Sequence, residues 1–227
     1  MHSHLSYSMG DSAPFDEEGV TTALELEFGL LPIDRYYDEM AREGRPINYG
    51  ASVSWAQARP AVIDGLEPIP SISAFQKAAS SKNWSTQLAT ADQIASMIEF
   101  VGNGLRQGGL GIGFNVGYAS HSGRKEYYEL NKLAAARHVP TFTHVRYISV
   151  DEPQSCFDAY EEVVAVAAST GAHMHICHVN STVLRDAPRI LELINSAQQR
   201  GVDGHRRRHV PRTELARAAR WSQRQRL

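Results

Sequence analysis

The chain has 227 residues, of which 42% are hydrophobic, so it can bury one sizeable core and lies near the lower size limit of an eight-stranded α/β barrel. It has no apolar run of about 18 residues and no basic start followed by an apolar stretch, so neither a membrane span nor a secretory signal is expected. The two cysteines, Cys156 and Cys177, lack metal-finger spacing and fit a reducing compartment. A cytoplasmic protein with no membrane partner is therefore expected.

Apolar runs with strand-like and helix-like periods alternate along the chain, with short breaks between them. Six strands are expected, at His2–Leu5, Val20–Glu27, Ile47–Trp55, Leu110–Tyr118, Val139–Tyr147 and His173–Val179. Helices are expected at Ile33–Arg42, Thr90–Arg106, Arg124–Arg137, Gln154–Ser169 and Val183–Arg200. The stretch 59–85, rich in Pro, Ser and Ile, is expected to be irregular. Repeated alternation of strand and helix predicts an α/β fold with a parallel sheet.

The charge changes abruptly at Gly204. From there to Leu227 the chain has eight Arg and one acid, which leaves 15 basic and 24 acidic residues before it, a net charge of −9. An Arg-rich tail on an acidic body often indicates nucleic-acid binding, but aromatic interleaving is absent here beyond Trp221. The codons of 204–211, read one nucleotide later, permit a plausible strand. We therefore expect residues 1–203 to form an incomplete barrel domain, residues 204–227 to be frameshifted or disordered, and no nucleic-acid partner.

Four histidines indicate a metal centre. Two His separated by one residue on an extended segment face the same side, so one ion could meet both His2 and His4. His144 and His178 each end a strand-like run, and a parallel α/β barrel places its chemistry at the C-terminal ends of its strands. Zinc catalysis requires His nitrogens and a carboxylate around an ion with an open position for water. The four histidines therefore predict a zinc site.

Candidates for the carboxylate and for substrate contacts lie on the same strands. Glu25 and Glu27 share one face of the second expected strand, and acids in an apolar run are costly unless ions or hydrogen bonds meet them. Glu27, nearer the C-terminal end, is the candidate ligand, with a solvated rim position as the alternative. Arg146, two residues beyond His144, could bind a substrate carboxylate, and a structural ion pair is an equal alternative. The remaining histidines considered are expected in loops, at helix ends or facing solvent or the outer helices: His121, His138, His173 and His175.

With these residues placed, the sequence resembles the amidohydrolase superfamily and, within it, the N-acyl-D-amino-acid deacylase group. The resemblance runs from Met1 to about Asp203 and depends on five anchors in order: His2 with His4, Gly19–Thr22, Gly108–Gly111, Thr143–Arg146 and Cys177–Val179. It implies a TIM-like barrel with a small flanking β-domain. It also implies one or two zinc ions bound by the four histidines, and hydrolysis of an amide.

The sequence departs from the family pattern at three places. The family's strand-two ligand is commonly a Cys in an Asn-Cys-Gly setting, so Glu27 would have to substitute for it. A substrate-binding Lys often stands two residues after the strand-six His, where this chain has Asn180, which becomes the substrate-binding candidate. The catalytic Asp of strand eight has no counterpart, so no catalytic residue is assigned. The chain is interpreted as a partial TIM-like barrel of about six strands that lacks the last strands and the small β-domain.

The expected function is metal-dependent hydrolysis of the amide bond of an N-acyl-D-amino acid, a small-molecule substrate, with activity of this chain lost together with the strand-eight Asp. The alternative among enzymes is a cyclic-amide hydrolase resembling dihydroorotase or hydantoinase. A carboxylated Lys on strand four would favour it, but 110–118 contains no Lys. The other alternative is a non-catalytic truncated remnant. The sequence does not define the oligomeric state.

Overall fold

The structure, a computed structural model, describes residue 19 and the ranges 21–71 and 83–202. Five parallel strands form one sheet in which spatial order follows chain order. They are β1 (Thr22–Leu30), β2 (Asn48–Ser54), β3 (Ile112–Asn115), β4 (Thr141–His144) and β5 (Met174–Ile176). This order, with helices in the connections, is that of consecutive strands in a TIM-like barrel. The predicted α/β class and partial barrel are confirmed, while the expected strand His2–Leu5 and the tail 204–227 lie outside the described residues.

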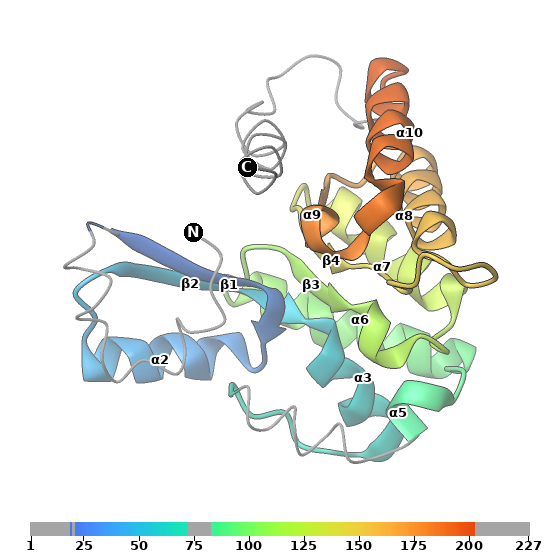
Figure 1. Cartoon of the computed structure of the whole chain (residues 1–227). Helices are drawn as coiled ribbons and strands as arrows, with labels where there is room; N and C mark the ends of the chain where they lie inside the picture. The colour runs from blue at the N-terminus through green and yellow to red at the C-terminus, as the bar shows by residue number, and fades with distance from the viewer. Residues whose placement is uncertain (1–18, 20, 72–82, 203–227) are drawn as a thin grey trace.

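The helices occupy the connections between successive strands, except for the last two, which follow β5 (Figure 1). They are α2 (Ile33–Glu43), α3 (Trp55–Asp64), α5 (Asn83–Thr86), α6 (Ala91–Arg106), α7 (Arg124–Ala136), α8 (Cys156–Thr170), α9 (Val179–Thr182) and α10 (Ala187–Gln199), with 3-10 turns η1 (Val116–Ala119) and η2 (Leu184–Asp186). Thr90 starts α6 with a capping box, as its N-cap position predicts. Gly171 ends α8 in the left-handed conformation. Within these described elements, no helix is long and apolar enough to cross a membrane.

One expectation about the connections was wrong at both ends of the stretch it covers, although residues 65–71 form no helix or strand, as expected. The stretch 59–85 was expected to be irregular, but α3 runs through Pro60 to Asp64, and α5 begins at Asn83. The six residues from Trp55 to Pro60 are all buried. A helical segment whose residues are all buried shows no amphipathic period. An internal Pro normally argues against a helix, so the sequence contains no signal for α3 and one against it.

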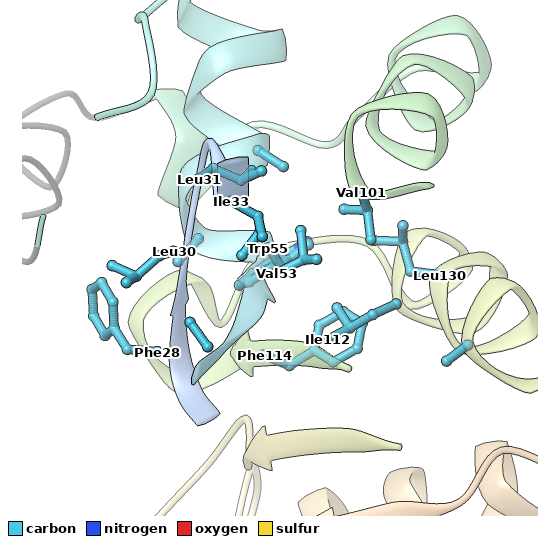
Figure 2. Packing of buried hydrophobic residues seen from close by; sticks show 14 of the residues in the cluster. Phe28, Leu30, Leu31, Ile33, Val53, Trp55, Val101, Ile112, Phe114 and Leu130 are labelled. Atoms are coloured by element: carbon cyan, nitrogen blue, oxygen red, sulfur yellow. The ribbon is translucent and has the colours of Figure 1, made fainter. Parts of the chain in front are cut away.

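The main core lies between the sheet and the surrounding helices. Figure 2 shows Ile112 and Phe114 of β3 together with Trp55 of α3 and with apolar side chains of α6 and α7. The Phe114 ring centroid is 6.0 Å from that of Trp55 and 5.0 Å from that of Tyr127. Because side chains alternate along a strand, Gly113 and Asn115 then face the other side of the sheet. That inner side is where the predicted ligands meet.

A buried ion pair joins two of the outer helices. Arg59 of α3 pairs with Glu126 of α7, and both side chains are at most 1% exposed. Glu126 also accepts a hydrogen bond of 2.6 Å from the Trp55 indole. Arg59 donates further to the carbonyls of Trp84 and Gln87, so the pair joins α5 and the residue that follows it to α3 and α7.

Candidate metal centre

Three predicted ligands, two from strands and one from the turn after a third strand, come together at the C-terminal edge of the sheet. Glu27 lies in β1, His144 is the last residue of β4, and His178 follows β5 by two residues. The Glu27 carboxylate is 3.0 Å from His144 Nδ1 through Oε1 and 2.7 Å from His178 Nε2 through Oε2. One ligand atom from each residue lies within 4.8 Å of the others. Two imidazoles and a carboxylate are a donor set that zinc uses when a fourth position stays open.

The two imidazole rings lie next to each other, and each has one nitrogen close to a different oxygen of the buried Glu27 carboxylate. Their centroids are 5.2 Å apart and their planes meet at 72°. Glu27 is 2% exposed, so the alternative of a solvated rim position is wrong. A buried carboxylate requires charged or hydrogen-bonding partners, which the two histidines supply. Glu25, also buried, accepts a hydrogen bond from the Phe28 amide and is not part of the cluster.

A bulge in β1 carries Glu27 toward β4. The pairing with β2 runs in register from Thr22–Asn48 to Glu25–Ala51 and then jumps to Leu30–Val53, so β1 has extra residues between these points. The Ser52 hydroxyl holds the bulge by donating to the Leu26 carbonyl at 2.5 Å. Gly29, at φ +66°, permits the return to the strand.

Gly113 of β3 gives the bulge room to cross the inner face of the sheet. A Cβ at this position would lie 2.5 Å from the Glu27 carbonyl oxygen and 2.7 Å from that of Leu26. Both are backbone atoms, so the contact could be relieved only by moving the bulge. Glycine inside a strand often marks such a close backbone approach.

We therefore expect Gly113→Ala to displace Glu27 from the two histidines. Zinc affinity should fall by about 10-fold or more, because the carboxylate would move away from the two imidazole nitrogens. Competition with a chromophoric chelator measures this affinity. Gly102→Ala in α6 is the matched control, because its Cβ would meet nothing closer than the end of Arg106 at 3.8 Å. Equal zinc affinity in both variants would show that the bulge does not set the position of Glu27.

His178 reaches the cluster through a turn. Regular alternation along the expected strand would place it on the face opposite to Cys177 and His175. The strand ends at Ile176, and His178 adopts φ +61° as the residue that precedes α9. This left-handed conformation takes His178 out of the alternation and brings its Nε2 to Glu27.

The other predicted residues have different surroundings. Arg146 is 4% exposed and forms a two-point ion pair with Glu162, so the structure shows the structural ion pair and not an open substrate-binding guanidinium. The strand β4 ends at His144, so His144 and Arg146 do not lie on the same face of one strand. Asn180 is exposed on α9, two residues from His178. The predicted ligands His2 and His4 lie outside the described residues.

The other histidines that the structure describes are exposed and lie outside the cluster: His121, His138, His173 and His175. Both cysteines are buried, and they form no disulfide with each other. The sequence does not point to the residues that position the ligands but bind nothing themselves. Gly113 and Ser52 are two of these, and a glycine between apolar residues in a strand was the one available signal.

Comparisons with solved structures show the fold. The N-acyl-D-glutamate deacylase from Bordetella bronchiseptica, solved with zinc and a phosphonate inhibitor, matches with a TM-score of 0.67 at 18% identity over 89% of this chain and 44% of that one. A D-aminoacylase variant in complex with copper chloride matches with a TM-score of 0.66 at 19% identity, over 88% and 44% of the two chains. A D-aminoacylase studied for its binuclear metal centre matches with a TM-score of 0.64 at 18% identity, over 87% and 44%.

The chain therefore has the fold of one part of the deacylase structures and spans less than half of their length. The resemblance expected from the sequence is confirmed at the level of fold. No family model matches the sequence, and no curated protein matches it.

Proposed function

We propose that this chain binds zinc and belongs to a hydrolase that cleaves the amide bond of N-acyl-D-amino acids. The observation that supports this most strongly is the cluster of Glu27, His144 and His178 at the C-terminal edge of the sheet. In α/β barrels this edge carries the chemistry. The solved structures with the same fold are deacylases, among them one that contains zinc.

The residues present fit a divalent ion. The buried Glu27 carboxylate has two oxygens, each close to a nitrogen of a different imidazole, so a bound ion would replace the hydrogen bond with His144 and the close contact with His178 by ligand bonds. A zinc ion held there supplies Lewis-acid chemistry, polarising a carbonyl and acidifying water. In this proposal Glu27, His144 and His178 are ligands, and His2 and His4 add further ligands for one or two ions. Asn180, exposed beside His178, contacts the substrate.

We further propose that the 227-residue chain, taken alone, releases no product. Amide hydrolysis needs a positioned acid or base that takes a proton from water and gives one to the leaving amine, worth about 10²–10⁴ in rate. In the described part of the chain, Glu27 is the sole acid of the cluster, and the proposal uses it as a ligand.

The test combines metal-dependent binding with turnover. Zinc-loaded protein is titrated with N-acetyl-D-glutamate and N-acetyl-L-glutamate by calorimetry, and release of free glutamate is followed separately. We expect zinc-dependent binding that favours the D enantiomer, and release no faster than in buffer. A Glu27→Gln variant that binds less zinc should lose the binding in parallel.

Two outcomes would contradict the proposal in different ways. If the zinc-loaded chain binds neither enantiomer, the substrate class is wrong. If it releases glutamate in a zinc-dependent manner, the claim that this chain lacks a catalytic acid or base is wrong. Glu25, Glu27 or His121 must then act as the base.

A further inference from the structure

Arg146 connects three segments around the metal centre. Its Nε and Nη2 donate to the two carboxylate oxygens of Glu162 in α8, at 2.7 and 2.8 Å. Its Nη1 donates to the carbonyls of Ser120 and Ser122, both at 2.8 Å, and to the Ser122 hydroxyl at 3.3 Å. All three guanidinium nitrogens are therefore engaged. A planar fork of this kind fixes geometry as well as charge.

The two serine carbonyls belong to the turn 116–122, which connects β3 to α7 and lies against His144. A Cβ on Gly117 would be 2.9 Å from His144 Cδ2 and 3.1 Å from its Nε2, so the turn touches this edge of the ring directly. The Tyr118 ring centroid lies 5.4 Å from that of His144. The opposite edge of the ring, at Nδ1, faces Glu27. The turn and Glu27 thus hold the imidazole from two sides.

We infer that Arg146 is a positioning residue for the metal centre, which holds the turn 116–122 against His144 and so fixes the orientation of that ligand. Arg146 follows His144 by two residues, so one short segment carries both the ligand and the anchor. The pairing with Glu162 extends the anchor to α8, whose N-terminus is fixed by the Ser155 capping box. This inference rests on the proposed metal centre.

The chain offers a matched control for the test. Arg59 and Glu126 form a second buried Arg–Glu pair, whose other hydrogen bonds go to Trp55, Trp84 and Gln87 and not to the turn. Glu162→Gln and Glu126→Gln therefore make the same chemical change in two buried pairs. Only the first pair holds the turn against His144. Arg146→Lys is the second test variant, because an ammonium cannot reproduce the two-point contact with Glu162 together with both carbonyls.

Three quantities are measured on folded protein: zinc affinity, the visible absorption spectrum of the cobalt(II)-substituted chain, and amide hydrogen exchange of the turn without metal. In Arg146→Lys and Glu162→Gln we expect zinc affinity to fall by about 10-fold or more, the range seen when outer partners of metal ligands are removed. The cobalt spectrum should change and the turn should exchange faster. Glu126→Gln should lower the melting temperature while zinc affinity and the cobalt spectrum stay as in the unaltered chain.

The inference and the proposed function fail in distinguishable ways. If the unaltered chain binds no zinc, the metal centre itself is wrong, and the inference fails with it. If the unaltered chain binds zinc, and folded Arg146→Lys and Glu162→Gln keep its affinity and cobalt spectrum, only the role of Arg146 is wrong. Equal loss of zinc affinity in Glu126→Gln would show a general effect of stability, which would also overturn the inference.

Discussion

Replacing His144 or His178 by alanine is expected to weaken zinc binding more than about 100-fold. Loss of a partner that only orients a ligand costs about 10–100-fold in affinity, and loss of the ligand itself should exceed that. Each substitution removes one of two imidazoles from a cluster in which a single ligand atom comes from each residue. Zinc content after dialysis and competition with a chelator measure the effect.

The control for this prediction is His173→Ala, which removes an exposed imidazole that lies just before β5 and outside the cluster. This variant should retain the zinc affinity of the unaltered chain. Melting curves of metal-free protein separate loss of ligation from loss of fold. Retention of zinc in both His144→Ala and His178→Ala would reject the site.

Among the substitutions proposed here, removal of Arg59 should lower the free energy of unfolding most. Arg59→Met leaves Glu126 buried without its cation, and breaking a buried ion pair from one side costs about 3–5 kcal/mol. The free energy of unfolding of a typical domain is about 5–15 kcal/mol, so a large share would be lost. Urea denaturation at neutral pH measures the change.

The pH dependence of this defect has a defined sign. Burial already raises the pKa of Glu126 above its ordinary value, while Arg59 lowers it, so the Arg59→Met variant should have a still higher pKa at Glu126. A raised carboxyl pKa in the folded state means that stability is lost as the pH rises from the ordinary value through the folded one. The defect should therefore grow from acid to neutral pH.

The exposed pair of Lys132 and Glu129 provides the control. Lys132→Met should leave the free energy of unfolding nearly unchanged, because exposed ion pairs contribute little. If Arg59→Met unfolds at the same urea concentration as Lys132→Met, the buried pair does not stabilise the fold.

Much of the fold could be predicted from local sequence signals. Thr90 and Gly171 mark helix ends because capping and left-handed backbone depend on the residue type itself. The alternation of strand and helix patterns from residue 20 to residue 200 predicts the parallel order of the sheet. The helix Trp55–Asp64 could not be predicted, because its first six residues are all buried and so show no periodic contrast between its faces.

The site was predictable in composition and less so in geometry. Glu27, His144 and His178 could be chosen because each ends or approaches the end of an apolar run. Their meeting depends on a bulge in β1, on Gly113 beneath it and on a left-handed turn at His178, which alternation along ideal strands does not contain. The role of Arg146 depends on where β4 ends. The expected strand ran to Tyr147, but β4 ends at His144, and Arg146 beyond it pairs with Glu162.

The central claim is that Glu27, His144 and His178 bind one metal ion together. Zinc K-edge X-ray absorption of the purified chain tests it most directly. The account predicts bound zinc with only nitrogen and oxygen ligands at about 2.0–2.2 Å, including the scattering of at least two imidazoles, and loss of one imidazole in His178→Ala. Absence of zinc, or sulfur at about 2.3 Å from Cys177, would contradict it.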